Sequence, residues 1–277
     1  MSDLFMQDGK LIKRRYCALS PYDRSFSLGD GLFETVKVAA GRPVWLEEHL
    51  ERMEKSALFA GIVCRYKRDE IAGQCAQVIA VSGVAEGFLR ITLSRGDSPL
   101  GRFSDLPQKG SLAIIAGTTA VSALPARAAF APWRINETDP AVRHKTTSKF
   151  SAVMAGRLAW EKGLDELVFL NTKGELSEGI VSNIFWTKDG ALFTPAVECG
   201  LLCGIARGKV MGAARTLGIT VATGSYFPEN LHDAESVFFT NSLTPMRMCD
   251  EMDGISKGKC TSVQAIENMV IAPDFFR

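Results

Sequence analysis

The order of its apolar runs limits this chain to a small set of folds. Two amphipathic helical runs, 46–62 and 68–83, follow one another directly, and two extended runs, 88–96 and 111–118, come after them. A doubly wound sheet would need strands and helices in alternation. The sequence also lacks a strand–GxGxxG–helix segment and a GxxxxGK[ST] segment, which excludes Rossmann and P-loop folds. The order therefore predicts an α+β fold.

The second half of the chain has its own set of elements. A helical run at 148–163 precedes extended runs at 165–171, 179–187 and 191–195, a helix at about 204–217, a strand at 236–241 and a final helix near 261–272. This order also fits an α+β domain better than a doubly wound one.

A change of composition separates the two halves. The stretch 119–133 is rich in Ala, Ser and Pro and has no clear period, which is typical of a domain boundary. We therefore predict an N-terminal α+β domain over 1–118, an interdomain linker over 119–133 and a C-terminal α+β domain over 134–277.

Charge and cysteine content exclude several classes of protein. The 32 basic residues nearly balance the 31 acidic ones, so the chain lacks the basic excess of a nucleic-acid binder. No apolar run approaches the roughly 18 residues of a membrane span, and residues 1–15 lack the pattern of a signal peptide. Seven scattered cysteines without a C-x-x-C pair indicate reduced thiols, and we expect a cytoplasmic protein.

Cys199 and Cys203 lie close enough in sequence to supply two ligands to a metal ion. None of the three histidines lies nearby, so two small buried thiols are the better interpretation. We therefore expect no metal site.

Two lysines stand four residues apart around the start of the helical run at 148–163. The simple interpretation of Lys145 and Lys149 is a basic helix start that faces water, and this segment alone favours it. The alternative is a nucleophilic lysine, whose pKa a pocket or a neighbouring cation must lower so that neutral amine exists near pH 7. Arg143 and His144 are such neighbours in sequence.

Three further features are compatible with a role in catalysis or ligand binding, but each of them is a weak signal by itself. Glu178 lies between a turn and an alternating strand, where a carboxylate points inward or stands exposed in the turn. A helix that begins near Ile205 presents amides suited to a phosphate, although many helices begin this way. Arg52 borders the apolar stripe of 46–62, where an arginine binds a carboxylate or phosphate or extends to solvent.

Together and in order, these segments resemble the motifs of the class IV aminotransferase family, the fold-type IV pyridoxal-phosphate enzymes. The matching segments are DRSFSLGDGLFETVKV, LEEHLERMEKSA, RHKTTSKFSAVMAGRLAWEKGLDELVFLN, LSEGIVSNIF and GLLCGIARGKV. The resemblance covers nearly the whole chain. It implies a two-domain α+β fold like that of D-amino-acid aminotransferase, with pyridoxal 5′-phosphate as the cofactor.

The resemblance also implies roles for individual residues. Lys145, not Lys149, stands at the position of the catalytic Schiff-base lysine, which moves the proton on the substrate's α-carbon. Glu178 stands where the family pairs a carboxylate with the pyridine nitrogen. The residues expected against the cofactor are Arg52, Lys145, Glu178, Ser182, Asn183, Ile205, Ala206, Asn241 and Ser242.

Two positions depart from the pattern of related enzymes. Ala206 replaces a threonine that is present in many of them, which removes a hydroxyl from the phosphate site but keeps the amide. Phe150 stands where branched-chain enzymes have a tyrosine, so one partner of the cofactor's phenolic oxygen is missing.

Within the family, TNSL at 240–243 resembles the aminodeoxychorismate lyases. These lyases carry an arginine-containing loop where LSRGDSPLGRFSDLP stands, so Arg102 is expected to bind a substrate carboxylate, although Phe103 replaces their usual tyrosine. Arg24, Arg90 and Arg95 are further candidates that are equally compatible with structural roles. The resemblance implies a lyase that releases pyruvate and, for folate synthesis, 4-aminobenzoate, with D-amino-acid transamination as the alternative. It also implies a homodimer with a shared active site.

Overall fold

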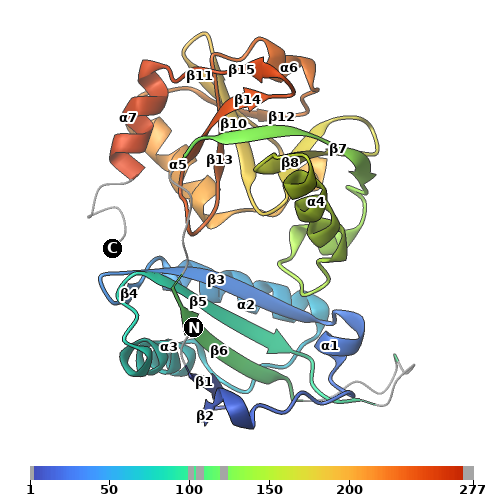
Figure 1. The fold of residues 1–277 in the computed structure, drawn as a ribbon, viewed down its shortest axis with the longest axis vertical. Coiled ribbons are helices and arrows are strands. Elements are labelled where there is room, and N and C mark those ends of the chain that lie inside the picture. Colours follow the sequence, from blue (N-terminus) through green and yellow to red (C-terminus); the bar gives the residue numbers. More distant parts are fainter. Residues whose placement is uncertain (1–2, 99–102, 104–108, 119–123, 271–277) are drawn as a thin grey trace. The chain divides into compact units, whose positions relative to one another are not determined.

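The computed structural model describes residues 3–98, 103, 109–118 and 124–270 (Figure 1). Helices and strands are mixed along the chain, which confirms the predicted α+β class. The chain divides into two compact units, Met1–Ala120 with His144–Lys149 and Val121–Arg143 with Phe150–Arg277. Each unit has its own sheet.

The first unit is built on a sheet that has six strands within the described residues, in the order β2-β1-β6-β5-β3-β4. Each pair of neighbouring strands is antiparallel. The elements are β1 (Leu4–Gln7), β2 (Lys10–Lys13), α1 (Arg24–Leu28), β3 (Gly31–Ala39), β4 (Arg42–Pro43), α2 (Leu46–Ala60), α3 (Arg68–Ser82), β5 (Gly87–Ser94) and β6 (Ser111–Gly117).

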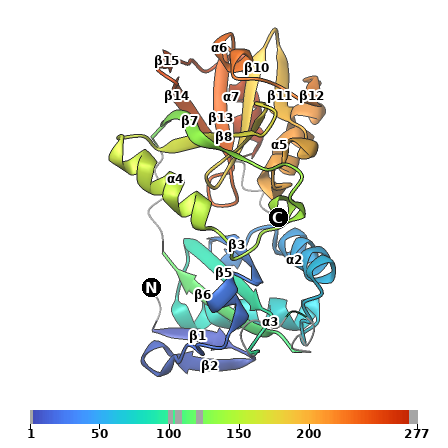
Figure 2. The same cartoon turned by 90° about the vertical axis from the view of Figure 1, so that its right-hand side faces the viewer.

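Helices α2 and α3 cover one face of this sheet (Figure 2). In α2, Leu50, Met53 and Ala57 recur at helical spacing and form one buried apolar stripe. In α3, the buried residues are Ile71, Cys75, Val78 and Ile79. Each large apolar side chain buried in this way stabilises the fold by about 1.5–3 kcal/mol. The two amphipathic runs therefore explain why this unit has a core on one side of its sheet.

Strand β3 carries an acidic residue on the covered face. Leu32, Val36 and Val38 alternate along the strand and are buried under the helices. Glu34 falls in the same alternation and is only 1% exposed. A charge at such a position requires partners, since an isolated buried carboxylate is very costly.

The second unit is built on a sheet of nine strands within the described residues, in the order β12-β11-β10-β13-β14-β7-β8-β9, with β15 paired to β14. Strand β9 also pairs with β10, so the strands from β9 round to β10 close into a small barrel. The elements are β7 (Ala126–Ile135), α4 (Phe150–Glu161), β8 (Glu166–Asn171), β9 (Leu176–Gly179), β10 (Asn183–Lys188), β11 (Ala191–Pro195), α5 (Ile205–Thr216), β12 (Val221–Gly224), α6 (Glu229–His232), β13 (Ser236–Thr240), β14 (Arg247–Met252), β15 (Ile255–Ser256) and α7 (Thr261–Val270).

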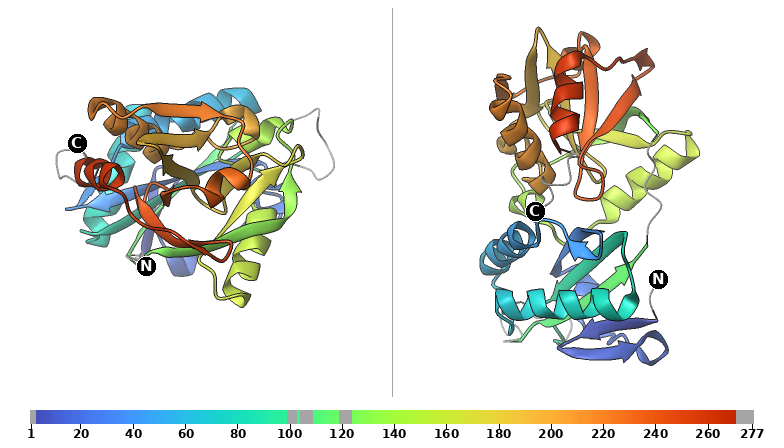
Figure 3. Two further views of the ribbon diagram at one scale, coloured as in Figure 1. Left: turned by 90° about the horizontal axis from the view of Figure 1, so that it is seen from above. Right: turned by 90° about the vertical axis from the view of Figure 1, so that its left-hand side faces the viewer.

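The alternation along β10 and β13 serves two cores. Ile184 and Trp186 pack with apolar residues of the other barrel strands. Phe185 and Phe238 face the opposite way, stack with ring centroids 5.2 Å apart and pack with apolar residues of α5 and α7. The right-hand view in Figure 3 shows these two helices on one face of the sheet. The sheet is therefore apolar on both faces, and the helix α5 packs against one of them.

The predicted linker over 119–133 differs from the structure. Residues 119–123 lie outside the described residues, and residues 126–133 form most of β7, which pairs with β14 and β8 inside the sheet. The residues that it buries at its start, Ala126 and Ala128, are small, so the strand gives only a weak periodic signal in the sequence. The unit boundary differs too, because Lys145 belongs to the first unit and not to a domain over 134–277.

Within the described residues, no helix is long and apolar enough to cross a bilayer. The same residues contain no group of three or more His, Cys, Asp or Glu side chains placed to hold a metal ion. Cys199 is buried, but Cys203 is exposed, so the expectation of two buried thiols is wrong for Cys203.

Candidate active site

The segment that carries Lys145 pairs with the start of β3. The backbone N–H of Phe33 donates to the carbonyl of Lys145 at 2.9 Å, and the N–H of Thr147 donates to the carbonyl of Gly31 at 2.9 Å. Leu32 and Thr146 form an antiparallel bridge. The backbone from Lys145 to Thr147 is therefore held by β3.

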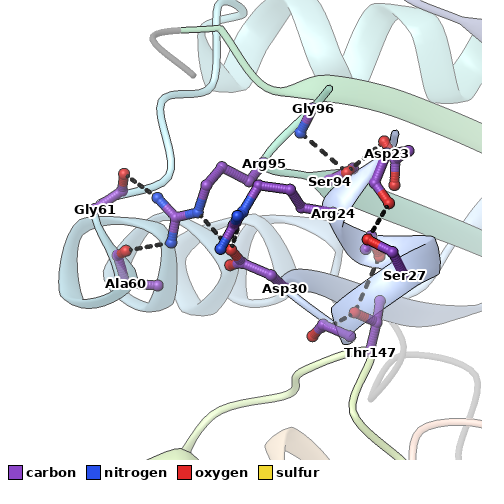
Figure 4. A network of polar contacts seen from close by, with 12 residues as sticks. Asp23, Arg24, Ser27, Asp30, Ala60, Gly61, Ser94, Arg95, Gly96 and Thr147 are labelled. Atoms are coloured by element: carbon purple, nitrogen blue, oxygen red, sulfur yellow. Dashed lines mark hydrogen bonds and ion pairs between the residues drawn. The ribbon is translucent and has the colours of Figure 1, made fainter. Parts of the chain in front are cut away.

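Side chains secure the same segment at its two ends. The ring of His144 stacks on Phe59 of α2, with centroids 4.1 Å apart, and its Nδ1 lies 2.9 Å from Ser56 Oγ. At the other end, Thr147 Oγ1 donates to the carbonyl of Gly29 at 2.8 Å, and Figure 4 shows Thr147 beside the polar network of α1. These contacts leave Lys145 little backbone freedom.

The amine of Lys145 and the guanidinium of Arg90 contact the same aromatic ring. Lys145 Nζ lies 4.6 Å from the centroid of Phe33, and Arg90 Cζ lies 4.2 Å from it. Both distances are in the range of cation–π contacts. Phe33 and Arg90 project from the sheet face opposite to the one that α2 and α3 cover. An amine and an arginine thus lie together on one ring.

Arg90 keeps its hydrogen-bonding capacity. Within the described residues, its guanidinium makes no hydrogen bond and no ion pair. Partial burial lowers its pKa, and the charge of Glu34 opposes that shift. A half-buried arginine without an anionic partner is suited to an incoming carboxylate.

Arg52 is held by a buried carboxylate. Its Nε donates to Glu34 Oε1 at 2.8 Å, and its Nη2 donates to Glu34 Oε2 at 2.6 Å. His49 Nδ1 lies 2.6 Å from the same Oε2. Burial alone raises the pKa of Glu34, but the hydrogen bonds from His49 and Arg52 and the charge of Arg52 bring it below its ordinary value. The orientation of Arg52 is therefore fixed by an ionised glutamate.

His49 is neutral in this arrangement. Burial lowers its pKa most, and the charges of Arg52 and Lys145 lower it further, against the effect of Glu34. Because Glu34 accepts a hydrogen bond from Nδ1, the neutral ring carries its proton there. Its Nε2 is buried and has no partner within the described residues.

Arg24 and Arg95 share a different carboxylate, as Figure 4 shows. The Nε atoms of both arginines donate to Asp30 Oδ2 at 2.8 Å. The other two nitrogens of Arg95 donate to the carbonyls of Ala60 and Gly61 at the end of α2. Both arginines are almost completely buried, so these contacts support structural roles for them.

In the second unit, Glu178 lies at the end of β9 and is half-buried. Its Oε2 accepts a hydrogen bond from the N–H of Leu202 at 2.9 Å. Asn183, which pairs with Glu178 across β9 and β10, donates from Nδ2 to the carbonyl of Leu202 at 2.9 Å. The two side chains thereby fix the loop that leads into α5.

The start of α5 has the features of an anion-binding site. Ile205 and Ala206 are its first two residues, and its N-cap, Gly204, has no side chain. A Cβ added at Gly204 would lie 2.1 Å from Asn183 Oδ1, so a larger residue there would have to displace the Asn183 amide. Helix amides and the helix dipole favour an anion at such a position.

Thr240 adds an uncommitted hydroxyl to the same region. It pairs with Asn183 across β13 and β10, which places both side chains on the sheet face under α5. Thr240 is 1% exposed, and its Oγ1 has no hydrogen-bond partner within the described residues. A buried hydroxyl of this kind needs a partner, and an anionic group at the start of α5 fits it.

The remaining predicted site residues have mixed surroundings. Ser182 Oγ donates a hydrogen bond to the buried Glu166 at 2.6 Å, so its hydroxyl hydrogen is engaged by that carboxyl group. Asn241 Oδ1 accepts hydrogen bonds from the backbone of Leu243 and Thr244 and shapes the loop that contains the half-buried Ser242. Arg102 lies outside the described residues.

Sequence reasoning missed three residues that support this arrangement: Glu34, His49 and Glu166. A signal existed for Glu34, because an acidic residue interrupts the apolar alternation of GLFETVKV on its buried face. His49 lies one residue before Leu50 in a helix, and Glu166 opens an apolar strand, so neither position stands out locally. Their roles depend on partners that lie far away in the sequence.

Comparison with known proteins identifies the family. The family described as Amino-transferase class IV matches residues 31–252. Aminodeoxychorismate lyase of Bacillus subtilis is 27% identical over 95% of this chain and 94% of its own length. A putative branched-chain-amino-acid aminotransferase of Methanocaldococcus jannaschii is 28% identical over 89% and 87%. D-alanine aminotransferase of Bacillus licheniformis is 24% identical over 91% and 89%.

A solved structure gives the same result. The crystal structure of a putative 4-amino-4-deoxychorismate lyase from Legionella pneumophila superposes with a TM-score of 0.89 at 27% sequence identity. The superposition covers 93% of this chain and 96% of the other. Because the family match spans most of the chain, the protein belongs to the class IV aminotransferases, enzymes that use pyridoxal 5′-phosphate.

Proposed function

We propose that this enzyme converts aminodeoxychorismate, a small amino-bearing dicarboxylate, into pyruvate and 4-aminobenzoate. One observation carries the proposal: the Lys145 amine and the Arg90 guanidinium contact the same ring of Phe33. An arginine so close to the expected catalytic amine suits a carboxylate of a substrate held there. The likeness to two lyases over more than nine-tenths of this chain supports the same reaction.

Lys145 is the residue that we assign to hold the cofactor and to move the proton. Pyridoxal phosphate, when bound, withdraws electrons from the carbon that bears the substrate's amino group and so makes the proton on that carbon acidic. The Nζ of Lys145 would hold the cofactor and, once the substrate amine takes its place there, would accept this proton. The backbone contacts of residues 144–147 with β3 and its neighbours direct the amine.

The other contacts with the cofactor are assigned by the kind of group that each residue offers. Glu178 supplies the carboxylate that keeps the pyridine nitrogen protonated. The amides of Ile205 and Ala206 suit the phosphate, which also gives the orphaned Thr240 hydroxyl a partner. Asn183, Asn241 and Ser242 complete the proposed set, together with the backbone of Ser182, whose hydroxyl is engaged by Glu166.

Arg52 is proposed as the cation at the phosphate. Glu34 accepts hydrogen bonds from two of its nitrogens and so fixes the plane of the guanidinium. A planar guanidinium held in a fixed orientation suits the recognition of a phosphate.

The lyase reaction needs no oxidant and no second substrate. Lys145 takes the proton from the ring carbon that bears the amino group, and the electrons of that bond enter the ring as the adjacent carbon–oxygen bond breaks. Enolpyruvate leaves with the electron pair of the carbon–oxygen bond and becomes pyruvate by taking up one proton at its methylene carbon, which balances the proton that Lys145 removed. The new carbon–carbon double bond completes the aromatic ring of 4-aminobenzoate. Arg90 holds a carboxylate of the substrate while these bonds break.

Transamination is the second candidate. The branched-chain and D-alanine aminotransferases match this chain at 28% and 24% identity, close to the 27% of the lyase. A D-amino-acid transaminase would use the same lysine but would require a 2-keto acid as its second substrate. The two reactions therefore differ in what they consume.

The deciding experiment follows from this difference. The purified enzyme, loaded with pyridoxal phosphate, is incubated with aminodeoxychorismate in the absence of any keto acid. We expect repeated turnover with equal amounts of pyruvate and 4-aminobenzoate. Absence of both products, together with keto-acid-dependent consumption of a D-amino acid, would make the enzyme a transaminase.

The role of Lys145 is tested against its neighbour in sequence. Lys145→Ala is expected to lower kcat by at least about 10³-fold, because the amine acts in the chemical step itself. Lys149→Ala is the matched control and is expected to keep nearly full activity. Borohydride reduction followed by peptide mapping is expected to find the cofactor on Lys145, and a label on Lys149 would contradict the assignment.

The role of Arg90 is tested by charge. Arg90→Leu is expected to raise KM for aminodeoxychorismate by about 10- to 100-fold, because a charge-assisted hydrogen bond to a carboxylate is lost. The exposed Arg42 at the edge of the same sheet provides the control variant Arg42→Leu. Equal KM values for the two variants would remove Arg90 from the substrate site.

We also propose that the enzyme is a homodimer, as the family resemblance implies. Sedimentation equilibrium is expected to give twice the 30.1 kDa mass of one chain. A single-chain mass at assay concentration, with full activity, would contradict this proposal.

A further inference from the structure

Glu166 is a buried carboxylate outside the set of proposed cofactor contacts. It is the first residue of β8 and is 7% exposed. Its Oε1 accepts a hydrogen bond from the backbone N–H of Ile180 at 2.7 Å, and its Oε2 accepts one from Ser182 Oγ at 2.6 Å. Both donors belong to the turn that joins β9 to β10.

This turn begins directly after Glu178. The N–H of Gly179 donates to the carbonyl of Ser182 at 2.8 Å, which closes the turn. A Cβ added at Gly179 would lie 2.9 Å from Glu166 Cδ and 2.4 Å from Ser182 Oγ, so the glutamate and the serine pack directly against the backbone there. Glu166 therefore forms two hydrogen bonds with the turn, to Ile180 and Ser182, and packs against Gly179.

The turn determines where the Glu178 carboxylate lies. On its other side, the carboxylate of Glu178 accepts a hydrogen bond from the N–H of Leu202 at 2.9 Å. Its backbone continues into Gly179, whose position depends on Glu166. A shift of the turn away from β8 would carry the Glu178 backbone with it, and small displacements of a reacting group have large effects on rate.

We infer that Glu166 is a positioning residue for Glu178, acting through the turn 179–182. The inference rests on the proposed function, in which Glu178 keeps the pyridine nitrogen of the cofactor protonated. No contact with the cofactor is assigned to Glu166. It fixes the backbone from which the pyridine-binding carboxylate projects.

The test uses three variants of the full-length protein. Glu166→Gln keeps the size of the side chain but replaces one acceptor oxygen with an amide that cannot accept from both donors. Ser182→Ala removes one of the two contacts and serves as a second, milder variant. Asp165→Asn is the matched control, because Asp165 is the adjacent residue but its side chain is 37% exposed and pairs with Arg247.

The readout is the protonation of the pyridine nitrogen, not activity alone. Each variant is reconstituted with pyridoxal phosphate carrying an isotope label at its ring nitrogen, and the nitrogen resonance is recorded by NMR. We expect Glu166→Gln to shift the resonance toward the unprotonated form and to lower kcat about tenfold or more with little change in KM. Ser182→Ala is expected to shift it less in the same direction, and Asp165→Asn not at all.

The outcomes separate this inference from the proposed function. If the wild-type protein shows the protonated resonance and both Glu166→Gln and Ser182→Ala keep it, the positioning role is overturned while the proposed function stands. If Glu166→Gln does not fold, Ser182→Ala decides the matter by the same readout. If the wild-type protein takes up no pyridoxal phosphate, the proposed function fails, and the inference fails with it.

Discussion

The two sheets each bury a glutamate, and folding shifts the pKa values of the two carboxyls in opposite directions. Glu34 in the first unit is 1% exposed and contacts Arg52 and His49. Glu166 in the second unit is 7% exposed and contacts a serine hydroxyl and a backbone amide. The pKa of Glu34 lies below its ordinary value, whereas burial raises the pKa of Glu166 to about 7.

The difference shows that burial alone does not set the charge of a glutamate. Desolvation raises the pKa of both carboxyls. A guanidinium that donates two hydrogen bonds reverses this shift at Glu34, because it stabilises the ionised form by charge as well as by hydrogen bonding. Neutral donors offset only part of the shift at Glu166. The charge of the partner is therefore decisive.

The largest expected effect comes from removing the charge of Glu34. Glu34→Gln leaves Arg52 beside a neutral group in a buried environment, and breaking a buried pair in this way costs about 3–5 kcal/mol. Urea denaturation near neutral pH measures the loss in the free energy of unfolding. A loss below about 1 kcal/mol would mean that solvent reaches Arg52 and compensates for the missing carboxylate.

The pH dependence of the same pair sharpens the comparison. Since the pKa of Glu34 is lowered on folding, its contribution to stability is present above its ordinary pKa of 4.5 and is lost as the pH falls through the folded-state value. Relative to Glu34→Gln, the wild-type protein is therefore expected to lose stability on acidification. A difference that is constant with pH would contradict the lowered pKa.

The contribution of Glu166 to the free energy of unfolding is expected to depend on pH in the opposite direction. Its pKa rises on folding from 4.5 to about 7, so its contribution is complete below about pH 4.5 and is lost as the pH rises through about 7. The difference between the two pKa values corresponds to roughly 3 kcal/mol. Denaturation of wild type and Glu166→Gln at about pH 5 and about pH 8 is expected to show the wild type losing up to this amount relative to the variant.

Ser182→Ala is expected to have a smaller effect on stability. The hydroxyl donates to Glu166 and lowers its pKa, so its loss leaves a buried acceptor with one donor fewer. The cost is about 1–2 kcal/mol at pH values where Glu166 is ionised. The pH range in which Glu166 lowers the free energy of unfolding is also expected to move to higher pH in this variant. If that range stays the same, Ser182 is not the partner that lowers the pKa of Glu166.

An exposed ion pair gives the smallest effect and serves as the reference for all three variants. Glu51 and Lys55 pair at 2.6 Å on the outer side of α2, and both side chains are largely exposed. Glu51→Gln is expected to leave the urea midpoint unchanged, because water and salt screen such a pair. A measurable loss would show that α2 is more sensitive to surface charge than its buried stripe suggests.

Much of the local structure follows from the sequence. Leu50, Met53 and Ala57 mark the helix α2 because their spacing matches its period. The alternation of 88–96 marks β5 for the same reason. The run 179–187 is predicted as one strand, and residues 183–187 do form most of β10. Residues 180–182 instead form the turn between β9 and β10, where Ile180 and Ser182 donate hydrogen bonds to Glu166.

The candidate site follows from the sequence only in part. The order of five motifs pointed to the family and singled out Lys145, Glu178 and Arg52. It did not distinguish among Arg24, Arg90 and Arg95. The structure separates them because Asp30 engages two of the three, whereas Arg90 has no such partner within the described residues.

The sequence by itself determined the periodic elements and the family, and it singled out Lys145 as the candidate lysine. Tertiary structure alone decided that the Lys145 segment pairs with β3, that β7 lies inside a sheet, and that Glu34 and Glu166 have different partners. The physical reason is the range of the interactions. Periodicity reports which side of an element is buried, whereas the charge state of a buried group depends on residues that the folded chain brings to it from elsewhere.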